Sequence, residues 1–362
     1  MNVVLAGGGT AGHVEPALAL ADALRAFDRA ITVTALGTER GLETRLVPAR
    51  GYQLDLIGAV PLPRKVSLDL LRVPTRLVAA VRRAGQHLQT READVVVGFG
   101  GYVSLPAYLA ARRARIPVVV HEANAKPGLA NRIGARLATR VAVTYDAHSL
   151  PGAVVTGMPI RRAIAELDRS ARREEARTTF GLDQDRPTLL VFGGSQGARR
   201  INDAVTAAAG ALTAGGAQVL HATGASNIDS VRAAVAGLSH YVSVAYIERM
   251  DLAYAAADLA VSRAGSTAYA ELTAVGLPAV FVPLPIGNGE QRLNAAAVVA
   301  AGGALLVRDA DFDAAWIEAN VVALLADATR LATMSAAAHA LGRPSADQAL
   351  MALVLEAAGA AR

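Results

Sequence analysis

The chain contains the same kind of junction twice: a short hydrophobic run that ends in a cluster of glycines and continues into a segment of helical periodicity. The first junction is NVVLAGGGTAGHVEPALALA, with its glycines at residues 7–12, and the second is TLLVFGGSQGARRIN, with its glycines at residues 193–197. A strand that turns tightly into a helix is how a βαβ unit begins, and such units build parallel sheets. The chain is therefore predicted to form α/β structure twice.

Other apolar, β-branched runs alternate with helical segments along the whole chain. We predict strands at residues 3–6, 31–36, 94–98, 117–121, 141–144 and near 154, and again at 188–192, 218–222, 242–246, 259–262, 278–283 and 304–307. Several of these runs are hydrophobic throughout, as expected of strands that helices cover on both faces. The predicted fold is two doubly wound, Rossmann-like domains with parallel sheets.

A polar and charged stretch, residues 157–187, separates the two halves, and the strand-then-glycine pattern starts again after it. We place the domain boundary in residues 157–162, which gives domains 1–158 and 159–341. With 362 residues, 53% of them hydrophobic, the chain can bury a core in each. Ligands of doubly wound sheets bind at the carboxyl ends of the strands, so an active site is expected between the domains.

Composition narrows the classes of function. The chain has no cysteine, which excludes disulfides, thiolate metal sites and cysteine nucleophiles. It lacks the pattern of a signal peptide and any uncharged apolar run of about twenty residues, so we expect neither a signal peptide nor a membrane span. The formal net charge of +5 favours an anionic partner, and residues 61–85 are the most basic stretch.

The first glycine turn formally satisfies the GxGxxG pattern of dinucleotide-binding folds. That fingerprint also needs an acid at the end of the second strand, where this chain has Gly37 and Thr38, with Glu39 beyond the expected place. A dinucleotide site is therefore disfavoured, and a purely structural turn stays an alternative. His13 follows the turn at the start of a helix, whose dipole would lower its pKa and let it accept a proton from a hydroxyl nucleophile. A capping or solvated histidine is the alternative.

The second half contains SRAGSTAYAELTAVGLP, a strand end, a loop and a helix. Small residues and hydroxyls at 264–267 would suit an oxyanion at the helix N-terminus, and Glu271 would reach a pair of sugar hydroxyls. Downstream, the amides of Gln291 and Asn294 could bind hydroxyls or a base edge. Helix caps and a surface acid are the alternatives. Together these residues favour a nucleoside diphosphate site. Asp309-x-Asp311 is similar to a metal-binding DxD motif but is predicted to be a solvated loop.

An ordered set of motifs resembles the MurG family of bacterial N-acetylglucosaminyltransferases. They are GGGTAGHVEPALALA, GTERGLETRLVP, GFGGYVSLP, HEANAKPGLANR, GMPIR, FGGSQGARRIN, SRAGSTAYAEL, GLPAVFVPLP and EQRLNA, between residue 2 and about residue 308. The resemblance implies the GT-B architecture, with an N-terminal acceptor domain, a C-terminal donor domain and a last helix, within residues 342–362, that returns to the first domain.

The resemblance also implies a reaction. The donor would be UDP-N-acetylglucosamine and the acceptor the C4 hydroxyl of the N-acetylmuramoyl residue of polyprenyl-linked lipid I. The products would be lipid II, with an inverted, β-1,4-linked sugar, and UDP, in peptidoglycan synthesis. The resemblance implies no cofactor, no metal ion and no binding of nucleic acid. It leaves other cell-wall synthesis proteins open as partners.

Because the motifs match those of the family, the resemblance also implies which residues bind the donor. They are Thr10, Ala11, Gly12, Asn124, Arg161, Ser195, Ile247, Ser266, Thr267, Ala268, Tyr269, Ala270, Glu271 and Gln291. His13 is our candidate for the general base, and Glu122 is the second candidate, with a hydrogen-bonded structural acid as its alternative. The chain departs from the family at Ala11, Ala123 and Glu290, which puts contacts from the last two in doubt.

The basic segment would lie on anionic lipid headgroups if its apolar and basic residues share a helical face. The residues of this predicted face are Leu70, Arg72, Arg76, Leu77, Val78, Val81 and Arg83. By itself the segment is an ordinary surface helix, but a polyprenyl-linked acceptor favours peripheral association with the cytoplasmic face of the cell membrane. The alternatives for function are a UDP-N-acetylglucosamine 2-epimerase, a GT-B transferase with another acceptor, a nucleotide-regulated binding protein and a dehydrogenase.

Overall fold

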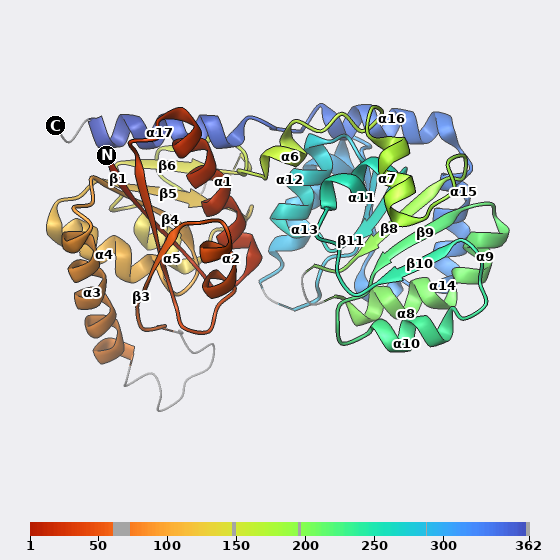
Figure 1. Cartoon of the computed structure of the whole chain (residues 1–362), viewed down its shortest axis with the longest axis horizontal. Coiled ribbons are helices and arrows are strands. Elements are labelled where there is room, and N and C mark those ends of the chain that lie inside the picture. The colour runs from red at the N-terminus through yellow and green to blue at the C-terminus, as the bar shows by residue number, and fades with distance from the viewer. Residues whose placement is uncertain (61–72, 147–149, 195–196, 287, 360–362) are drawn as a thin grey trace. The chain divides into compact units, whose positions relative to one another are not determined.

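The computed structural model describes residues 1–60, 73–146, 150–194, 197–286 and 288–359 (Figure 1). The chain forms two compact units. The first unit combines Met1–Arg161 with Ser345–Arg362, and the second is Arg162–Pro344. The C-terminal residues therefore belong to the first unit, although the whole second unit precedes them in the sequence.

The first unit is a seven-stranded parallel sheet in the order β3-β2-β1-β4-β5-β6-β7. Its strands are β1 (Asn2–Gly7), β2 (Thr32–Gly37), β3 (Gln53–Leu56), β4 (Val95–Gly100), β5 (Val118–Glu122), β6 (Arg140–Val143) and β7 (Ala153–Val155). Its helices are α1 (Ala11–Phe27), α2 (Glu43–Ala49), α3 (Val73–Thr90), α4 (Ser104–Ala114), α5 (Leu129–Gly134) and α17 (Ala346–Gly359).

Helices cover both faces of this sheet because side chains alternate along each buried strand. In β1, Val3 and Leu5 pack into the hydrophobic cluster on the α1 side, whereas Val4 and Ala6 pack into the cluster under α3 and α4. Helix α17 packs beside α1 and contributes Leu350 to the first of these clusters (Figure 1). The prediction of a C-terminal helix that returns to the first domain is confirmed.

The second unit is a six-stranded parallel sheet in the order β10-β9-β8-β11-β12-β13. Its strands are β8 (Thr188–Phe192), β9 (Gln218–Ala222), β10 (Tyr241–Val244), β11 (Leu259–Ser262), β12 (Ala279–Phe281) and β13 (Ala304–Leu306). Its helices are α6 (Arg162–Ala165), α7 (Arg173–Phe180), α8 (Arg199–Ala207), α9 (Ala209–Ala214), α10 (Ile228–Ala234), α11 (Met250–Ala256), α12 (Ser266–Ala274), α13 (Glu290–Ala300), η2 (Asp309–Asp311), α14 (Ala314–Ile317), η3 (Glu318–Val322), α15 (Ala323–Leu325) and α16 (Ala328–His339).

Every predicted strand has a counterpart in the structure, and the α/β, doubly wound fold class is confirmed. The sequence analysis missed β3, which pairs with β2 at the edge of the first sheet. Its sequence, QLDL, alternates in polarity and has no β-branched residue, so it lacks the composition that marked the other strands.

The order of the strands predicts where each unit would bind a ligand. Strand order reverses between β1 and β4 in the first sheet and between β8 and β11 in the second. Ligands of doubly wound sheets bind outside the carboxyl ends of the strands at such a switch point. The fold therefore directs attention to the loops after β1 and β4 and to the loops after β8 and β11.

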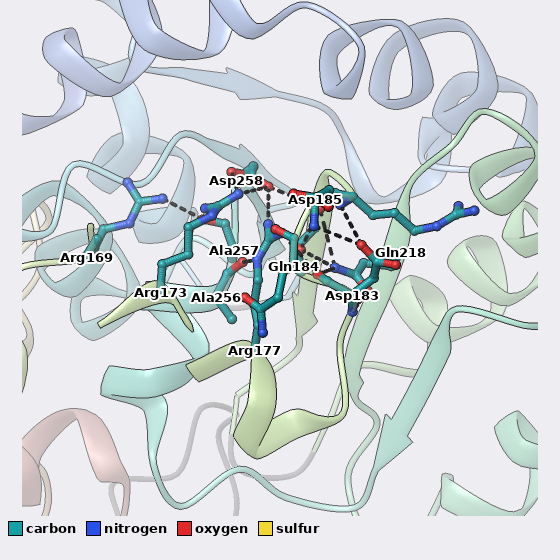
Figure 2. Close-up of polar contacts among 12 residues, drawn as sticks. Arg169, Arg173, Arg177, Asp183, Gln184, Asp185, Gln218, Ala256, Ala257 and Asp258 are labelled. Carbon is teal, nitrogen blue, oxygen red and sulfur yellow. Dashed lines mark hydrogen bonds and ion pairs between the residues drawn. The ribbon is translucent and has the colours of Figure 1, made fainter. Parts of the chain in front are cut away.

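A cluster of arginines surrounds Asp258 at the other end of the second sheet, where the strands begin (Figure 2). The carboxylate of Asp258 accepts bonds from Arg173 at 2.8 Å and Arg177 at 3.0 Å, and also from the N–H of Thr188 at 2.8 Å. Arg177 is fully buried and also donates to the carbonyls of Ala256, Asp183 and Gln184. This cluster attaches α7 to the beginnings of β8 and β11.

A cavity of about 360 Å³ lies beside this cluster and is lined by Arg169, Arg173, Asp258 and residues of α16. Arg169 donates to the carbonyls of Tyr254, Ala257 and Gly276. Its guanidinium therefore binds the protein's own backbone. Because the cavity lies where the strands begin, it does not coincide with the carboxyl-end edge where ligands of such sheets bind.

Candidate active site

His13 lies at the switch point of the first sheet. It is in the first turn of α1, where its Nδ1 is 3.2 Å from Oγ1 of Thr10, the residue before the helix. The imidazole packs against the loop after β4: a Cβ atom at Gly100 would lie 3.2 Å from His13 Nε2, and one at Gly101 would lie 3.4 Å from Nδ1. Both glycines have positive φ, so this loop needs glycine for its backbone and for the space that His13 occupies.

The surroundings of His13 favour the neutral imidazole. Burial lowers the pKa of His13 below its ordinary value of 6.5, while a hydrogen bond with the Gly8 backbone and the charge of Glu43 act in the opposite direction. We predicted a lowered pKa from the helix dipole; the principal cause is burial. A neutral histidine with one ring nitrogen donating to a carbonyl keeps the other as a proton acceptor.

Glu122, at the end of β5, is surrounded by donors from its own loop. Its Oε1 accepts the N–H of Asn124 at 2.9 Å, and its Oε2 accepts the N–H of Gly128 at 3.0 Å and Nδ2 of Asn131 at 2.9 Å. Only 3% of Glu122 is exposed, and burial raises its pKa. This geometry supports the alternative of a hydrogen-bonded structural acid and leaves His13 as the stronger candidate base.

Sequence reasoning missed Glu43, the first residue of α2. It is fully buried, its Oε2 accepts the N–H of Gly9 at 2.8 Å, and its Oε1 accepts the N–H and hydroxyl of Thr38 at 2.8 and 2.9 Å. A Cβ at Gly8 or at Gly37 would lie 2.5 Å from its side chain. Gly8 and Gly37 were the features of the sequence that could have indicated a buried side chain here.

A carboxylate behind the first glycine turn also disfavours a pyrophosphate at that turn, which argues against the dinucleotide alternative.

In the second unit, the loop after β11 leads directly into α12, which begins at Ser266 with Gly265 as its N-cap. Asn294 is fully buried and donates to Ser266 Oγ at 3.1 Å and to the Ala264 carbonyl at 3.2 Å. We predicted that Asn294 would bind a ligand; instead its amide holds this loop. Gln291 Oε1 accepts the N–H of Leu284 at 2.9 Å.

Glu271 lies on the second turn of α12 and is not the surface acid of our alternative. Only 6% of it is exposed, and its Oε2 accepts the hydroxyl of Tyr254 at 2.7 Å. Tyr254 belongs to α11 and is fully buried, so the carboxylate is held in one place. Along the same helix, Tyr269 is buried, whereas Thr267, Ala268 and Ala270 are half-buried.

The prediction of a solvated loop at Asp309-x-Asp311 is wrong for its first residue. Asp309 forms an ion pair with Nη1 of Arg263, which precedes the small residues of the β11 loop. Arg263 also donates to the carbonyl of Val282 at 3.1 Å, and Arg200 donates to the Ala310 carbonyl at 2.8 Å. The η2 turn thus anchors the loop after β11 and the beginning of α8, and Asp309 serves as the counter-ion of Arg263.

The second glycine turn is tightly packed in its described part. A Cβ at Gly193 would lie 2.3 Å from the Ala198 nitrogen, and one at Gly197 would lie 2.2 Å from the Thr223 carbonyl oxygen. That carbonyl accepts Nδ2 of Asn202 at 2.8 Å. Ser195 lies outside the described residues, and Ile247, after β10, is buried.

The other predicted donor-site residues are distributed over both units. Ala11 and Gly12 are half-buried in the first turn of α1, Nδ2 of Asn124 lies 3.5 Å from Glu122 Oε1, and Arg161 is half-buried at the end of the first unit. Within the first unit the structure brings Thr10 and His13 to one switch point. Within the second unit, Ser266 and Glu271 lie on α12, which follows β11, and Gln291 lies on α13, which follows the neighbouring strand β12.

The predicted membrane face is partly wrong in composition. Leu70 and Arg72 lie outside the described residues, Val81 packs against the core cluster under α3, and Arg76 and Leu77 are half-buried. The face of α3 that looks to solvent carries Val78, 50% exposed, with Arg82 and Arg83. The physical reason is that Ala80, Ala84 and Leu88 are the buried residues of α3, so the face that carries them, together with Val81, packs toward the sheet.

Within the described ranges, no single helix is long and apolar enough to cross a membrane. One bent pair of helices, Ala314–Leu325 and Ala328–His339, reaches the required length and apolar composition only when the two are taken together.

Comparison with known protein families covers most of the chain. Residues 3–143 match the model of the glycosyltransferase family 28 N-terminal domain, and residues 188–350 match that of the glycosyltransferase family 28 C-terminal domain. These two segments lie in the first and second structural units respectively, apart from the last few residues of the second match. Each match therefore contains one of the two switch points.

Individual relatives give the same picture. A UDP-N-acetylglucosamine--N-acetylmuramyl-(pentapeptide) pyrophosphoryl-undecaprenol N-acetylglucosamine transferase from Streptomyces avermitilis is 59% identical over 360 residues, which cover 99% of each chain. The crystal structure of MurG from Acinetobacter baumannii is similar with a TM-score of 0.78 and 28% identity, over 98% of this chain and 99% of that one. A UDP-GlcNAc 2-epimerase from Neisseria meningitidis has a TM-score of 0.70 at 15% identity, over 98% and 100% of the two chains, which is a likeness of fold alone.

Proposed function

The chain belongs to glycosyltransferase family 28, and from this premise we propose how its residues carry out the transfer of a sugar to a polyprenyl-linked acceptor. The enzyme moves N-acetylglucosamine from UDP-N-acetylglucosamine to lipid I, which gives lipid II and UDP in peptidoglycan synthesis. The observation that carries this conclusion is 59% identity to a transferase of that name over 99% of both chains.

The first unit is proposed to bind the acceptor. The C4 hydroxyl oxygen of the N-acetylmuramoyl residue attacks the anomeric carbon of N-acetylglucosamine, and the bond from that carbon to the diphosphate oxygen breaks. His13 takes the hydroxyl proton, because its neutral imidazole lies at the switch point where the acceptor is expected. Attack from the face opposite UDP inverts the anomeric centre and produces a β-1,4 linkage.

The second unit is proposed to bind the donor. The N-terminus of α12, from Ser266, supplies N–H groups and hydroxyls to the diphosphate, on which negative charge develops as UDP leaves. Glu271, whose carboxylate is held by the hydroxyl of Tyr254, accepts hydrogen bonds from the ribose hydroxyls. Ile247 lies against the uracil, Gln291 completes the pocket, and Ser195 serves the diphosphate. Thr10, Ala11, Gly12, Asn124 and Arg161 contact the donor from the first unit.

A transfer assay tests this function directly. Purified protein incubated with UDP-N-acetylglucosamine and a lipid I analogue is expected to form the disaccharide product and release UDP in equal amounts. The same protein without acceptor is the control, because an epimerase converts the free nucleotide sugar without any acceptor. Conversion without acceptor, or NAD binding with no thermal stabilisation by UDP, would contradict the proposal.

We also propose that α3 brings the enzyme to the anionic cytoplasmic face of the membrane as a peripheral protein. The support is the solvent-facing combination of Val78, Arg82 and Arg83. One apolar side chain with flanking arginines fits a weak, electrostatic association with headgroups. The polyprenyl chain of the acceptor requires catalysis at such a surface.

Charge reversal on α3 tests the membrane proposal. Arg82→Glu with Arg83→Glu is expected to lower binding to anionic vesicles about tenfold or more, since each basic residue near the surface contributes about 1 kcal/mol. Cosedimentation at low and high salt measures the change. A control with Arg29→Glu and Arg232→Glu makes the same charge change at exposed positions elsewhere and should bind like the wild type. Equal losses in both variants would place the contact elsewhere.

A further inference from the structure

A buried carboxylate lies directly behind the turn that carries His13. Glu43 has no exposed surface, and its two oxygens accept three hydrogen bonds: from the N–H of Gly9 at 2.8 Å, and from the N–H and hydroxyl of Thr38 at 2.8 and 2.9 Å. Glu43 therefore ties the loop after β1 to the loop after β2. Hydrogen bonds to an ionised carboxylate are among the stronger ones in proteins.

Gly8 separates this carboxylate from the imidazole. On one side, a Cβ at Gly8 would lie 2.5 Å from Glu43 Oε1; on the other, the Gly8 backbone forms a hydrogen bond with His13. A Cβ at Gly101 would meet the Gly8 carbonyl oxygen at 2.7 Å and His13 Nδ1 at 3.4 Å, so this carbonyl and the imidazole lie side by side. A shift of Glu43 would therefore move both the position of the imidazole and its hydrogen-bond acceptor.

Among the described groups near His13, Glu43 is the one whose charge acts on the imidazole. Thr10 on the same turn and Gly100 at the end of β4 lie against the imidazole and carry no charge. Asn131 on α5 approaches the same side of Gly100 as the imidazole and is also uncharged. Glu122 lies behind Asn131, which donates to it at 2.9 Å. Of the described groups, Glu43 has the charge that raises the pKa of His13, against the lowering that burial causes.

We propose that Glu43 is a positioning residue for the transfer reaction: it holds the turn that carries His13 and stabilises the imidazolium that forms when His13 accepts the proton of the acceptor hydroxyl. This inference rests on the proposed role of His13 as the base. The proton of the acceptor hydroxyl stays on the imidazole in this step. Glu43 acts as the acid of a catalytic triad does, but through one glycine residue rather than by a direct bond.

Glu43→Gln removes the charge and keeps the shape. We expect kcat to fall about 10-fold to 100-fold, because the amide group offers hydrogens to N–H donors and the turn shifts. KM for UDP-N-acetylglucosamine should change less than about threefold, since the groups proposed to bind the phosphates and ribose of the donor lie in the second unit. The acidic limb of the kcat/KM profile should move to lower pH, because losing a negative charge lowers the pKa of His13 further. Glu39→Gln, an exposed acid on the same loop, is the matched control and should behave like the wild type.

A double-mutant cycle with His13→Ala separates this inference from the proposal on which it rests. If Glu43 acts through His13, adding Glu43→Gln to His13→Ala should lower kcat by less than about threefold further. Equal losses in both backgrounds, or an acidic limb that does not move, would reduce Glu43 to a structural role. Wild-type turnover of His13→Ala would refute the base itself, whatever Glu43 does.

Thr38→Val keeps the inference testable should Glu43→Gln not fold. This variant removes one hydrogen bond to the carboxylate and keeps its charge. We expect a lower kcat with an acidic limb at the wild-type pH, and circular dichroism checks the fold. Wild-type kcat in a folded Thr38→Val would overturn the positioning role.

Discussion

Replacing His13 with alanine is expected to lower kcat by about 10²-fold to 10⁴-fold, the usual contribution of a general base. The sugar hydroxyl that attacks is a weak nucleophile unless its proton is removed in the transition state, and alanine leaves no acceptor at this switch point. Binding of UDP should change little, because the loops proposed to bind its phosphates and ribose belong to the second unit. Steady-state kinetics with a lipid I analogue, and calorimetric titration with UDP, measure the two quantities.

The pH profile of the wild-type enzyme gives a second measure of the same residue. Burial lowers the pKa of His13 below 6.5, so the base stays neutral down to a pH below that value. The kcat/KM value should be level near neutral pH and fall as the pH falls through this lowered pKa; the limb should be absent in His13→Ala. His240→Asn is a suitable control, since His240 is exposed and asparagine tolerates its positive φ. Unchanged turnover in His13→Ala would remove His13 from the mechanism.

Replacing Asp258 with alanine is expected to destabilise the second unit by about 3–5 kcal/mol, the effect of removing one partner of a buried ion pair. Arg177 has no exposed surface, and the Asp258 carboxylate 3.0 Å from its Nη2 is its counter-ion (Figure 2). Without Asp258 the buried guanidinium loses its ion-pair partner, and the N–H of Thr188 loses its acceptor.

Trp316 makes this measurement selective. It is the one tryptophan of the sequence and lies in α14 of the second unit, so its fluorescence follows the unfolding of that unit in urea. The midpoint of this transition should fall in Asp258→Ala. Glu175→Ala removes the carboxylate that pairs with Arg172 at the exposed face of α7 and should shift the midpoint little. Similar midpoints in the two variants would contradict the stabilising role of the Asp258 cluster.

Local patterns predicted the strands that are rich in apolar or β-branched residues, including the edge strands β7, β10 and β13. They did not predict β3, an edge strand with one partner and alternating polarity. They also assigned Val81 of α3 to the membrane face, although this side chain packs against the core. A helical pattern shows which residues share a face, but whether that face packs inward depends on the sheet beneath it, as Val81 shows.

The candidate site was predictable where one short segment holds both the turn and the functional side chain. His13 and Glu271 are of this kind, since each follows its strand within a single motif. Glu43 and Asn294 could not be predicted in the same way, because their burial depends on partners brought together by the fold. Gly8 follows β1 and Gly37 ends β2, and both leave room for Glu43, which itself belongs to a helix. Such residues are recognised only once the order of the strands is known.

The position of α17 has a consequence for biosynthesis. Leu350, Val354 and Ala357 belong to the same hydrophobic cluster as Val3 and Leu5 of β1. The ribosome therefore makes the first strand of this core before the entire second unit, and its last helix after that unit. Domains generally fold as units while synthesis proceeds. The second unit has all its residues before the first unit does, so the unit that is translated first is the last that can complete its core.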